Sequence, residues 1–209
     1  MEIRCYEPDD LPALYDICLR TGDSGADATG QFADPKLLGE AYAAPYAAHN
    51  PSLISVAVDE DGVAGYIIGC LDTLTFEDWC RREWWPPLRE RYPEPADDDA
   101  SRDARIIRMF YAPDRPWPRP YLDPPATHPS HLHIDLLPHA QGHGLGRRLM
   151  DRLLDQLAVF GSPGVHLGVS ARNSQAIGFY QRIGFTPLLV EPPADRKPTG
   201  HVLGLTLPR

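Results

Sequence analysis

Two short segments combine residue types and spacings that could do chemistry, and the first is rich in glycine. Residues 138–149 read PHAQGHGLGRRL, between an apolar run and a predicted helix. Closely spaced glycines let backbone N–H groups approach a ligand without a Cβ in the way, and the positive end of the helix dipole points at the same place. The pattern predicts a pyrophosphate cradle that needs no lysine and matches neither the GxxxxGK[ST] nor the dinucleotide motif. A tight turn without a ligand is the alternative.

The second segment is residues 173–185, NSQAIGFYQRIGF. Asn173 is a good helix N-cap and Gly184 a good helix stop. Asn173 and Tyr180 share one helical face and could both address a groove. A tyrosine hydroxyl in such a groove can give a proton to a leaving thiolate. The alternative is that Phe179 and Tyr180 are both core aromatics.

These segments belong to an alternation of strands and helices. Period-two and helical spacings of apolar residues predict a mixed α/β sheet of about seven strands flanked by helices. An irregular insert rich in Trp and Pro, at about 73–130, separates strands three and four; within it we expect helical pieces over 75–92 broken at Pro86-Pro87, a mobile acidic segment over 94–104 and an extended loop over 112–129. The predicted strands are 2–6, 52–58, 63–71, 131–137, 165–170, 185–190 and 201–207. One predicted helix starts at the Pro8 signal and runs through Arg20, and the others cover 35–48, 144–160 and 173–183.

Composition narrows the class of protein. The 209 residues suit a single domain over 1–209, and the net charge of −9 is spread along the chain, which argues against nucleic-acid binding. The four cysteines form no CxxC pair and no zinc spacing, so no metal is expected. With no apolar run near the ~18 residues of a membrane helix and no signal core, the expected location is the cytoplasm.

Together the two segments resemble the GNAT superfamily of N-acetyltransferases. Gln141, Gly144 and Gly146 match its Q/R-x-x-G-x-G/A acetyl-CoA motif. The second segment matches its N-x-x-A-x-x-F-Y-x-x-x-G-F motif. The matching residues there are Asn173, Ala176, Phe179, Tyr180, Gly184 and Phe185.

A closer similarity extends over much of the chain. It resembles the acetyltransferase-like C-terminal domain of O-GlcNAcase and its stand-alone bacterial relatives. The residues that carry it are Ile17-Cys18, Asp61-Gly62 with Gly65-Tyr66, Asp72 with Phe76 and Cys80, Trp84 to Tyr92, and Pro129-Ser130 ahead of Asp135. Because the phosphate motif is whole in this chain, the resemblance favours a true CoA binder.

The resemblance implies roles for individual residues. Backbone groups of Leu136 and Leu137 would pair with the pantetheine arm, to which Asn173 would also bond, and Ala176 and Phe179 would adjoin the donor. Tyr180 would protonate the departing CoA thiolate. The pyrophosphate would be held by N–H groups from Gln141, Gly142, His143, Gly144, Leu145 and Gly146, with Arg147 nearby.

The proton acceptor would stand on the fourth strand, where the family often uses Glu or His. His131, His133 and Asp135 lie on one face there if no β-bulge intervenes. Asp135 and His133 are the candidates, and a structural hydrogen bond to a loop is the alternative for each. Asp72 could line the acceptor pocket or cap the helix that begins near Leu74.

The resemblance thus implies an acetyl-CoA-dependent N-acetyltransferase in which a primary amine attacks the thioester directly in a ternary complex. The alternative is a CoA-binding, non-catalytic recognition module. A protein lysine, an N-terminus or a small-molecule amine would fit the motifs equally well, and neither the acyl-chain preference nor the oligomeric state follows from the sequence.

Overall fold

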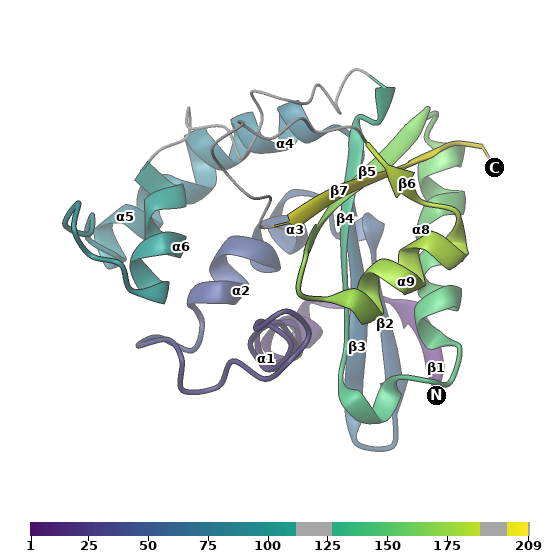
Figure 1. Ribbon diagram of the computed structural model, residues 1–209, viewed down its shortest axis with the longest axis horizontal. Helices are drawn as coiled ribbons and strands as arrows, with labels where there is room; N and C mark the ends of the chain where they lie inside the picture. Colours follow the sequence, from purple (N-terminus) through teal and green to yellow (C-terminus); the bar gives the residue numbers. More distant parts are fainter. Residues whose placement is uncertain (112–126, 189–199, 209) are drawn as a thin grey trace.

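The computed structural model describes residues 1–111, 127–188 and 200–208, and within them a seven-stranded sheet forms the centre (Figure 1). The strand order is β1-β2-β3-β4-β5-β7-β6. Every neighbouring pair is antiparallel except β4 and β5, which are parallel. This confirms the predicted mixed α/β sheet. The strands are β1 (Glu2–Cys5), β2 (Ile54–Asp59), β3 (Gly62–Cys70), β4 (Ser130–Leu136), β5 (Gly164–Ser170), β6 (Thr186–Pro187) and β7 (Gly200–Thr206).

Helices cover both faces of the sheet (Figure 1). Side chains alternate along each strand, so Tyr66 and Ile68 of β3 enter one core and Ile67 enters the other. The helical elements are η1 (Pro8–Asp10), α1 (Leu11–Arg20), α2 (Leu37–Tyr42), α3 (Ala44–His49), η2 (Pro51–Leu53), α4 (Thr73–Trp79), the π-helix η3 (Cys80–Trp84), α5 (Trp85–Arg91), α6 (Arg102–Tyr111), η5 (Pro138–Ala140), α8 (Leu145–Val159) and α9 (Ser174–Ile183).

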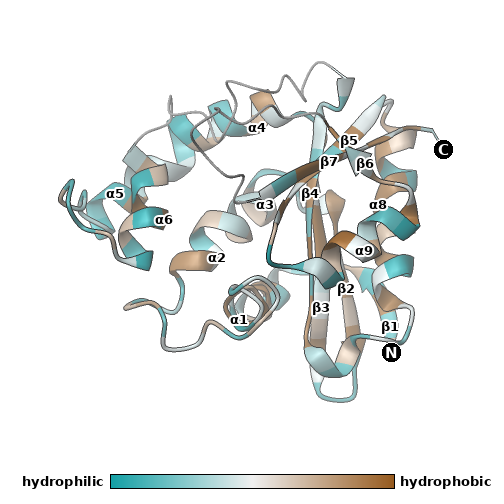
Figure 2. Cartoon of the chain, in the orientation of Figure 1, coloured by the Kyte–Doolittle hydropathy of each residue, from teal (hydrophilic) through white to brown (hydrophobic). Residues whose placement is uncertain are grey.

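The two cores belong to different helices. Residues of α1 to α6 pack on one face, and residues of α8 and α9 pack on the other. Apolar colour runs along β2, β3 and β4 in Figure 2, where the sheet lies between these layers. Among the helices of the described residues, none is both long and apolar enough to cross a membrane.

Four predicted elements differ from the structure. The helix expected over 35–48 is two helices, because the backbone turns at Ala43 (φ −128°). The second helix, α3, begins at Ala44 with Pro45 in its first turn, where the missing N–H of proline costs nothing. Pro86 and Pro87 do not break a helix. They lie in the first turn of α5, and helical structure runs from Thr73 to Arg91.

The acidic segment 94–104 leads into a helix, α6, that was not predicted from the sequence. Ser101 accepts a hydrogen bond from the N–H of Ala104 (3.1 Å), which is the usual way to start a helix. The strand expected over 185–190 is limited to β6, with 189–190 outside the described residues, as are 112–126 of the expected proline-rich loop.

Candidate active site

The two parallel strands at the centre of the sheet separate after a short paired stretch. Only Ser130 with Val165 and His131 with His166 are partners between β4 and β5. Beyond them β4 stays on β3 and β5 stays on β7. We call this divergence the splay. The main chain of β4 beyond His131 therefore has one edge that β5 does not pair.

The register of β4 decides which backbone groups face the splay. The pairing of β3 with β4 is continuous, from Gly65 with Leu136 to Cys70 with His131, and the N–H of Leu137 donates to the Ala64 carbonyl (2.9 Å). Hydrogen-bonding direction alternates along an antiparallel strand. The N–H and C=O groups of Ile134 and Leu136 consequently point away from β3, toward the splay.

The same unbroken register fixes the side chains. His131, His133 and Asp135 lie on one face of β4, toward α1 to α3, because no bulge intervenes. The register shift in this part of the sheet lies in β2, between Ala57 and Val58. The shared face was predicted from the alternation of these residues.

The glycine-rich loop approaches the splay from the end of β4. Gly142 (φ +80°) and Gly144 (φ +75°) adopt left-handed backbone, and a Cβ on either would meet no atom within 4 Å. Gly144 is the N-cap of α8, and Arg148 N to Gly144 O (3.1 Å) is a bond of its first turn. The N–H groups of residues 145–147 therefore lie outside the helical ladder, at the positive end of the dipole. This geometry suits a pyrophosphate.

Close packing positions this helix end. A Cβ on Gly146 would stand 3.3 Å from the Phe179 ring and 3.4 Å from the Leu136 side chain, so only glycine lets α8 approach both β4 and α9 without adjustment. The Gln141 side chain donates to the Leu136 carbonyl (2.9 Å) and Gln175 of α9 donates to Gln141 (3.2 Å). Of the backbone groups assigned to pantetheine, the Leu136 N–H faces the splay, whereas the Leu137 N–H is bonded to β3.

The charged residues of the loop lie on its outer side. Arg147 forms an i,i+4 ion pair with Asp151 (3.0 Å) along the surface of α8. His143, Leu145 and Arg148 help to line a surface hollow of about 320 Å³. The positive charge of Arg147 is thus partly balanced by Asp151. The backbone N–H groups at the start of α8 supply the directed positive potential.

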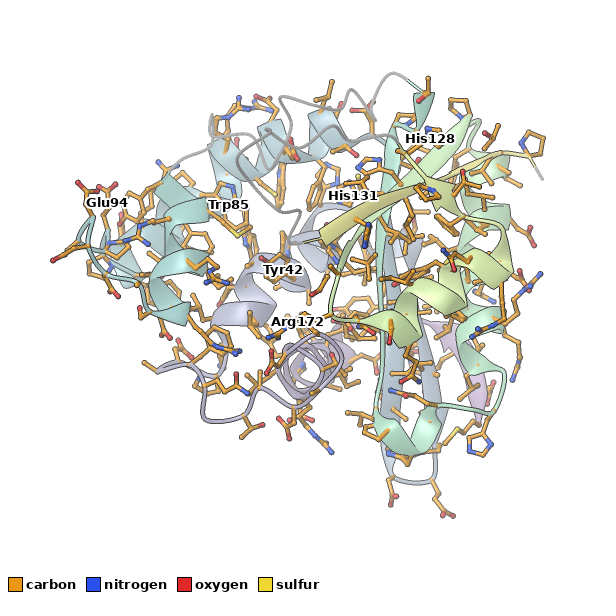
Figure 3. The ribbon with its side chains drawn as sticks, in the orientation of Figure 1. Tyr42, Trp85, Glu94, His128, His131 and Arg172 are labelled. Carbon is orange, nitrogen blue, oxygen red and sulfur yellow. The ribbon has the colours of Figure 1, made fainter. Side chains whose placement is uncertain are left out.

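Asn173 starts α9 at the far side of the splay. Its Oδ1 accepts a hydrogen bond from the N–H of Ala176 (3.0 Å), as an N-cap does. Its Nδ2 faces the loop after α1, where a Cβ on Gly25 would lie 3.1 Å from it. In the same region Arg172 bonds Asp23 of that loop (2.7 Å; Arg172 is labelled in Figure 3). Asn173 therefore has a structural role that uses only its oxygen.

Tyr180 packs against two aromatic rings and also lies within electrostatic range of Asp135. The residue is 8% exposed, and its ring lies 5.4 Å from Phe179 and 5.8 Å from Phe185. Burial and the negative charge of Asp135 raise the pKa of the Tyr180 hydroxyl. The hydroxyl accordingly keeps its proton at neutral pH and lies within electrostatic range of the Asp135 carboxylate.

Asp135 is half-buried on β4. Burial raises the pKa of its carboxyl, and a hydrogen bond donated by Tyr66 (2.7 Å) opposes that rise. Tyr66 is fully buried on β3, so its hydroxyl fixes one carboxylate oxygen. Thr21 also faces Asp135, although its hydroxyl geometry donates to the Ile17 carbonyl (2.8 Å). A carboxylate of raised pKa is a stronger base than an exposed one.

His133 is surrounded by rings. The Tyr46 hydroxyl lies 3.0 Å from its Nε2 and 2.6 Å from Nε2 of His131. Tyr42 extends from α2 (labelled with His131 in Figure 3), and its ring centre is 5.9 Å from that of His133. Burial, and then the neighbouring His166, lower the pKa of His133 to about 4. The imidazole is therefore neutral at neutral pH and only weakly basic.

Asp72 stands at the start of α4. Its Oδ1 accepts a hydrogen bond from the N–H of Thr75 (2.7 Å), so its carboxylate caps that helix. A contact with the acceptor stays a prediction. Among the residues that the structure describes, no three His, Cys, Asp or Glu side chains are grouped so as to hold a metal ion.

Trp79, Trp84 and Trp85 pack against the first core. Trp84 donates to the Glu40 carbonyl (3.0 Å) and Trp79 stacks on it, with ring centres 6.0 Å apart. Sequence reasoning missed Tyr46 and Tyr66 as site residues. Tyr66 lies on a predicted strand, and pairing that strand with β4 would have placed it opposite Asp135. No sequence pattern indicated Tyr46.

Comparisons with known proteins agree with this geometry. The model of the acetyltransferase (GNAT) family matches residues 27–185, and the chain belongs to that family. It is similar to protein O-GlcNAcase of Rattus norvegicus, with 28% identity over 183 residues that cover 87% of this chain and 20% of the relative. The chain thus spans about a fifth of the length of that relative.

Solved structures show the same fold. The crystal structure of SsHAT superposes with a TM-score of 0.88 and 37% identity, covering 100% of this chain and 98% of the other. The structure of yncA from Salmonella typhimurium with its cofactor acetyl-CoA has a TM-score of 0.55 and 19% identity, covering 100% and 95%. The GNAT fold predicted from the two motifs is confirmed, and the chain is an acetyltransferase by family.

Proposed function

We propose that this chain transfers an acetyl group from acetyl-CoA to a primary amine by direct attack in a ternary complex. The observation that carries the proposal is the placement of Asp135 and Tyr180, a half-buried base and a protonated acid, within electrostatic range of each other. The splay and the glycine-rich loop beside them suit the donor.

The chain's own groups suit each part of the donor. Backbone N–H groups at the start of α8 would hold the pyrophosphate. The Leu136 N–H would pair with pantetheine along the free edge of β4. The Ile134 N–H faces the same edge and would polarise the thioester carbonyl, where negative charge develops during attack.

The proton balance follows from the two pKa directions. The amine nitrogen bonds to the thioester carbon, Asp135 accepts one amine proton, and the carbon–sulfur bond breaks. Tyr180 gives its proton to the departing thiolate, so that the products are the acetylated amine and free CoA. Solvent returns the proton of Asp135 to Tyr180, whose raised pKa favours recapture.

The test is a transfer assay with acetyl-CoA and a panel of primary amines, in which thiol release and acetylated product are both measured. Product formed in step with thiol supports transfer. Thiol release without product would show hydrolysis alone. Tight acetyl-CoA binding without turnover of any amine would contradict the proposal and favour the recognition module that the relationship to O-GlcNAcase suggests.

A further inference from the structure

A chain of partly buried hydrogen bonds runs from the insert to His133. It begins at the backbone carbonyl of Pro129, which accepts from the Thr73 N–H (2.8 Å) and from the Thr73 hydroxyl (2.7 Å). The hydroxyl oxygen then lies 2.8 Å from Nδ1 of His131. The Tyr46 hydroxyl links Nε2 of His131 (2.6 Å) to Nε2 of His133 (3.0 Å).

The direction of every bond in this chain follows from its first member. A carbonyl can only accept, so the single hydroxyl proton of Thr73 is committed to Pro129. Thr73 must then accept a proton from Nδ1–H of His131. In neutral His131 the remaining nitrogen, Nε2, accepts from the Tyr46 hydroxyl. The Tyr46 oxygen in turn accepts from Nε2–H of His133.

A charged His131 would not satisfy the same contacts. Its Nε2–H would point at the Tyr46 oxygen together with the N–H of His133, and the Tyr46 proton would need another acceptor. Tyr46 is only 5% exposed, and a buried hydroxyl without an acceptor is costly. The neutral arrangement therefore leaves His133 with a proton on Nε2 and a bare Nδ1. Within the described residues no hydrogen bond reaches that Nδ1.

The chain is an orienting device and not a proton conductor. Its last member is the Pro129 carbonyl, which cannot take up a proton. Cys70 lies 3.2 Å from Nδ1 of His131, and burial raises the pKa of its thiol to about 12, so the thiol also stays neutral. A proton that entered at His133 would have nowhere to go.

We propose that Tyr46 and Thr73 are positioning residues of the acetyl-transfer site, which hold His131 and His133 in single tautomers so that the bare Nδ1 of His133 accepts a hydrogen bond from the acceptor amine. The inference rests on the proposed function. His133 lies two residues from Asp135 on the same face of β4 and directly before Ile134, whose N–H faces the splay.

This arrangement gives a primary amine two acceptors. One N–H is bonded by His133 Nδ1, the other N–H is bonded by Asp135, and the nitrogen lone pair is left for the thioester carbon. Burial lowers the pKa of His133 and raises the pKa of Asp135, so His133 holds the amine and Asp135 takes the proton. A secondary amine has one N–H, so one of the two acceptors would lose its partner, and we expect discrimination against N-methylated acceptors.

The first experiment reads the tautomers by NMR of ¹⁵N-histidine-labelled protein, with His133→Gln to assign the signals. In the unmodified protein we expect His133 protonated at Nε2 and His131 at Nδ1. Tyr46→Phe keeps the ring but removes the link, so the His133 signals should shift to a mixture of tautomers. The matched control is Tyr42→Phe, because the Tyr42 hydroxyl bonds the Met109 sulfur (3.3 Å) and not a histidine. His133 protonated at Nδ1 would overturn the inference.

The second experiment measures kinetics with a primary amine and its N-methyl analogue. Loss of one oriented hydrogen bond should lower kcat/KM for the primary amine about tenfold in Tyr46→Phe and reduce the preference over the analogue, while the Kd of acetyl-CoA stays unchanged. Thr73→Val should act in the same direction, and Thr73→Ser, which keeps the hydroxyl, should restore activity. Unchanged kcat/KM and preference in Tyr46→Phe and Thr73→Val would overturn the positioning role.

The two experiments separate this inference from the proposed function. If the unmodified protein acetylates no amine, the proposed function fails, and with it the role of the tautomers in transfer. The NMR measurement needs no turnover, so it still decides whether Tyr46 and Thr73 fix the two histidines.

Discussion

Tyr180 on α9 lies within electrostatic range of Asp135 on β4, and burial together with the negative charge of that carboxylate raises the pKa of the Tyr180 hydroxyl. The two residues come from segments 45 positions apart, since the chain forms α8 and β5 between them. Burial also raises the pKa of the Asp135 carboxyl. Each group is thereby shifted toward the form that its chemistry needs: a stronger base at Asp135 and a retained proton at Tyr180.

Replacing Tyr180 by Phe should affect turnover and leave binding intact. The ring and its contacts with Phe179 and Phe185 remain, so the melting temperature and the Kd of acetyl-CoA should hardly change. The lost hydroxyl matters when charge develops on sulfur, and kcat should fall on the order of 10²-fold. Steady-state kinetics and calorimetry check this, and an unchanged kcat would assign Tyr180 to packing.

Asp135→Asn should separate activity from stability. The amide oxygen can still accept from Tyr66, but the base is gone, and kcat/KM should fall by ~10²–10⁴ with the Kd of acetyl-CoA unchanged. The same assay on His133→Gln tests the other candidate base, for which we expect the smaller loss. A larger loss at His133 would reverse the assignment.

The pH dependence of the melting temperature should show what it costs to bury the charged form of Asp135. A carboxyl whose pKa is raised in the folded state favours folding at low pH, and that contribution is lost as pH rises through the raised pKa. Asp135→Asn cannot ionise. Its melting temperature should match that of the unmodified protein in acid and exceed it at neutral pH. Thermal melts from acid to neutral pH measure the difference, and equal melting temperatures throughout would show that Asp135 carries no burial penalty.

The phosphate cradle can be tested with matched glycine substitutions. Gly144 and Gly161, at the two ends of α8, both have left-handed φ (+75° and +82°), and a Cβ on either would meet no atom within 4 Å. Glutamate at either should cost about 1–2 kcal/mol of backbone strain. Only Gly144→Glu places a negative charge at the helix N-terminus, and it should weaken acetyl-CoA binding at least about thirtyfold by calorimetry. Equal affinities in the two variants would remove the assignment.

The helix-capping role of Asn173 and its proposed contact with acetyl-CoA can be tested separately. Asn173→Asp keeps an oxygen for the Ala176 N–H but has no Nδ2 donor, so the melting temperature should hold while the Kd of acetyl-CoA rises about tenfold. Asn173→Ala loses both groups and should also destabilise the protein by about 1 kcal/mol. If the Asp variant binds acetyl-CoA normally, Asn173 serves only as a cap.

Local chemistry made much of the fold predictable. The glycines of the 138–149 loop, the Asn173 cap and the Gly184 stop act through residues close in sequence, so the ends of α8 and α9 followed from spacing alone. Alternation placed His131, His133 and Asp135 on one face of β4. Where local signals were ambiguous, as at Pro86-Pro87, the predicted helix break was wrong, because proline is tolerated in a first helical turn as readily as it ends a helix.

What the sequence by itself determined, then, was the glycine-rich loop before α8, the helix that carries Tyr180 and the face that carries Asp135. Only the tertiary structure decided the electrostatics and partners of those residues. Tyr66 reaches Asp135 from 69 positions away, and Tyr46 reaches His131 from 85. Such contacts depend on strand register and on how α3 packs against β4. The pKa of a side chain follows from burial and neighbouring charge, which long-range packing creates and local sequence patterns do not contain.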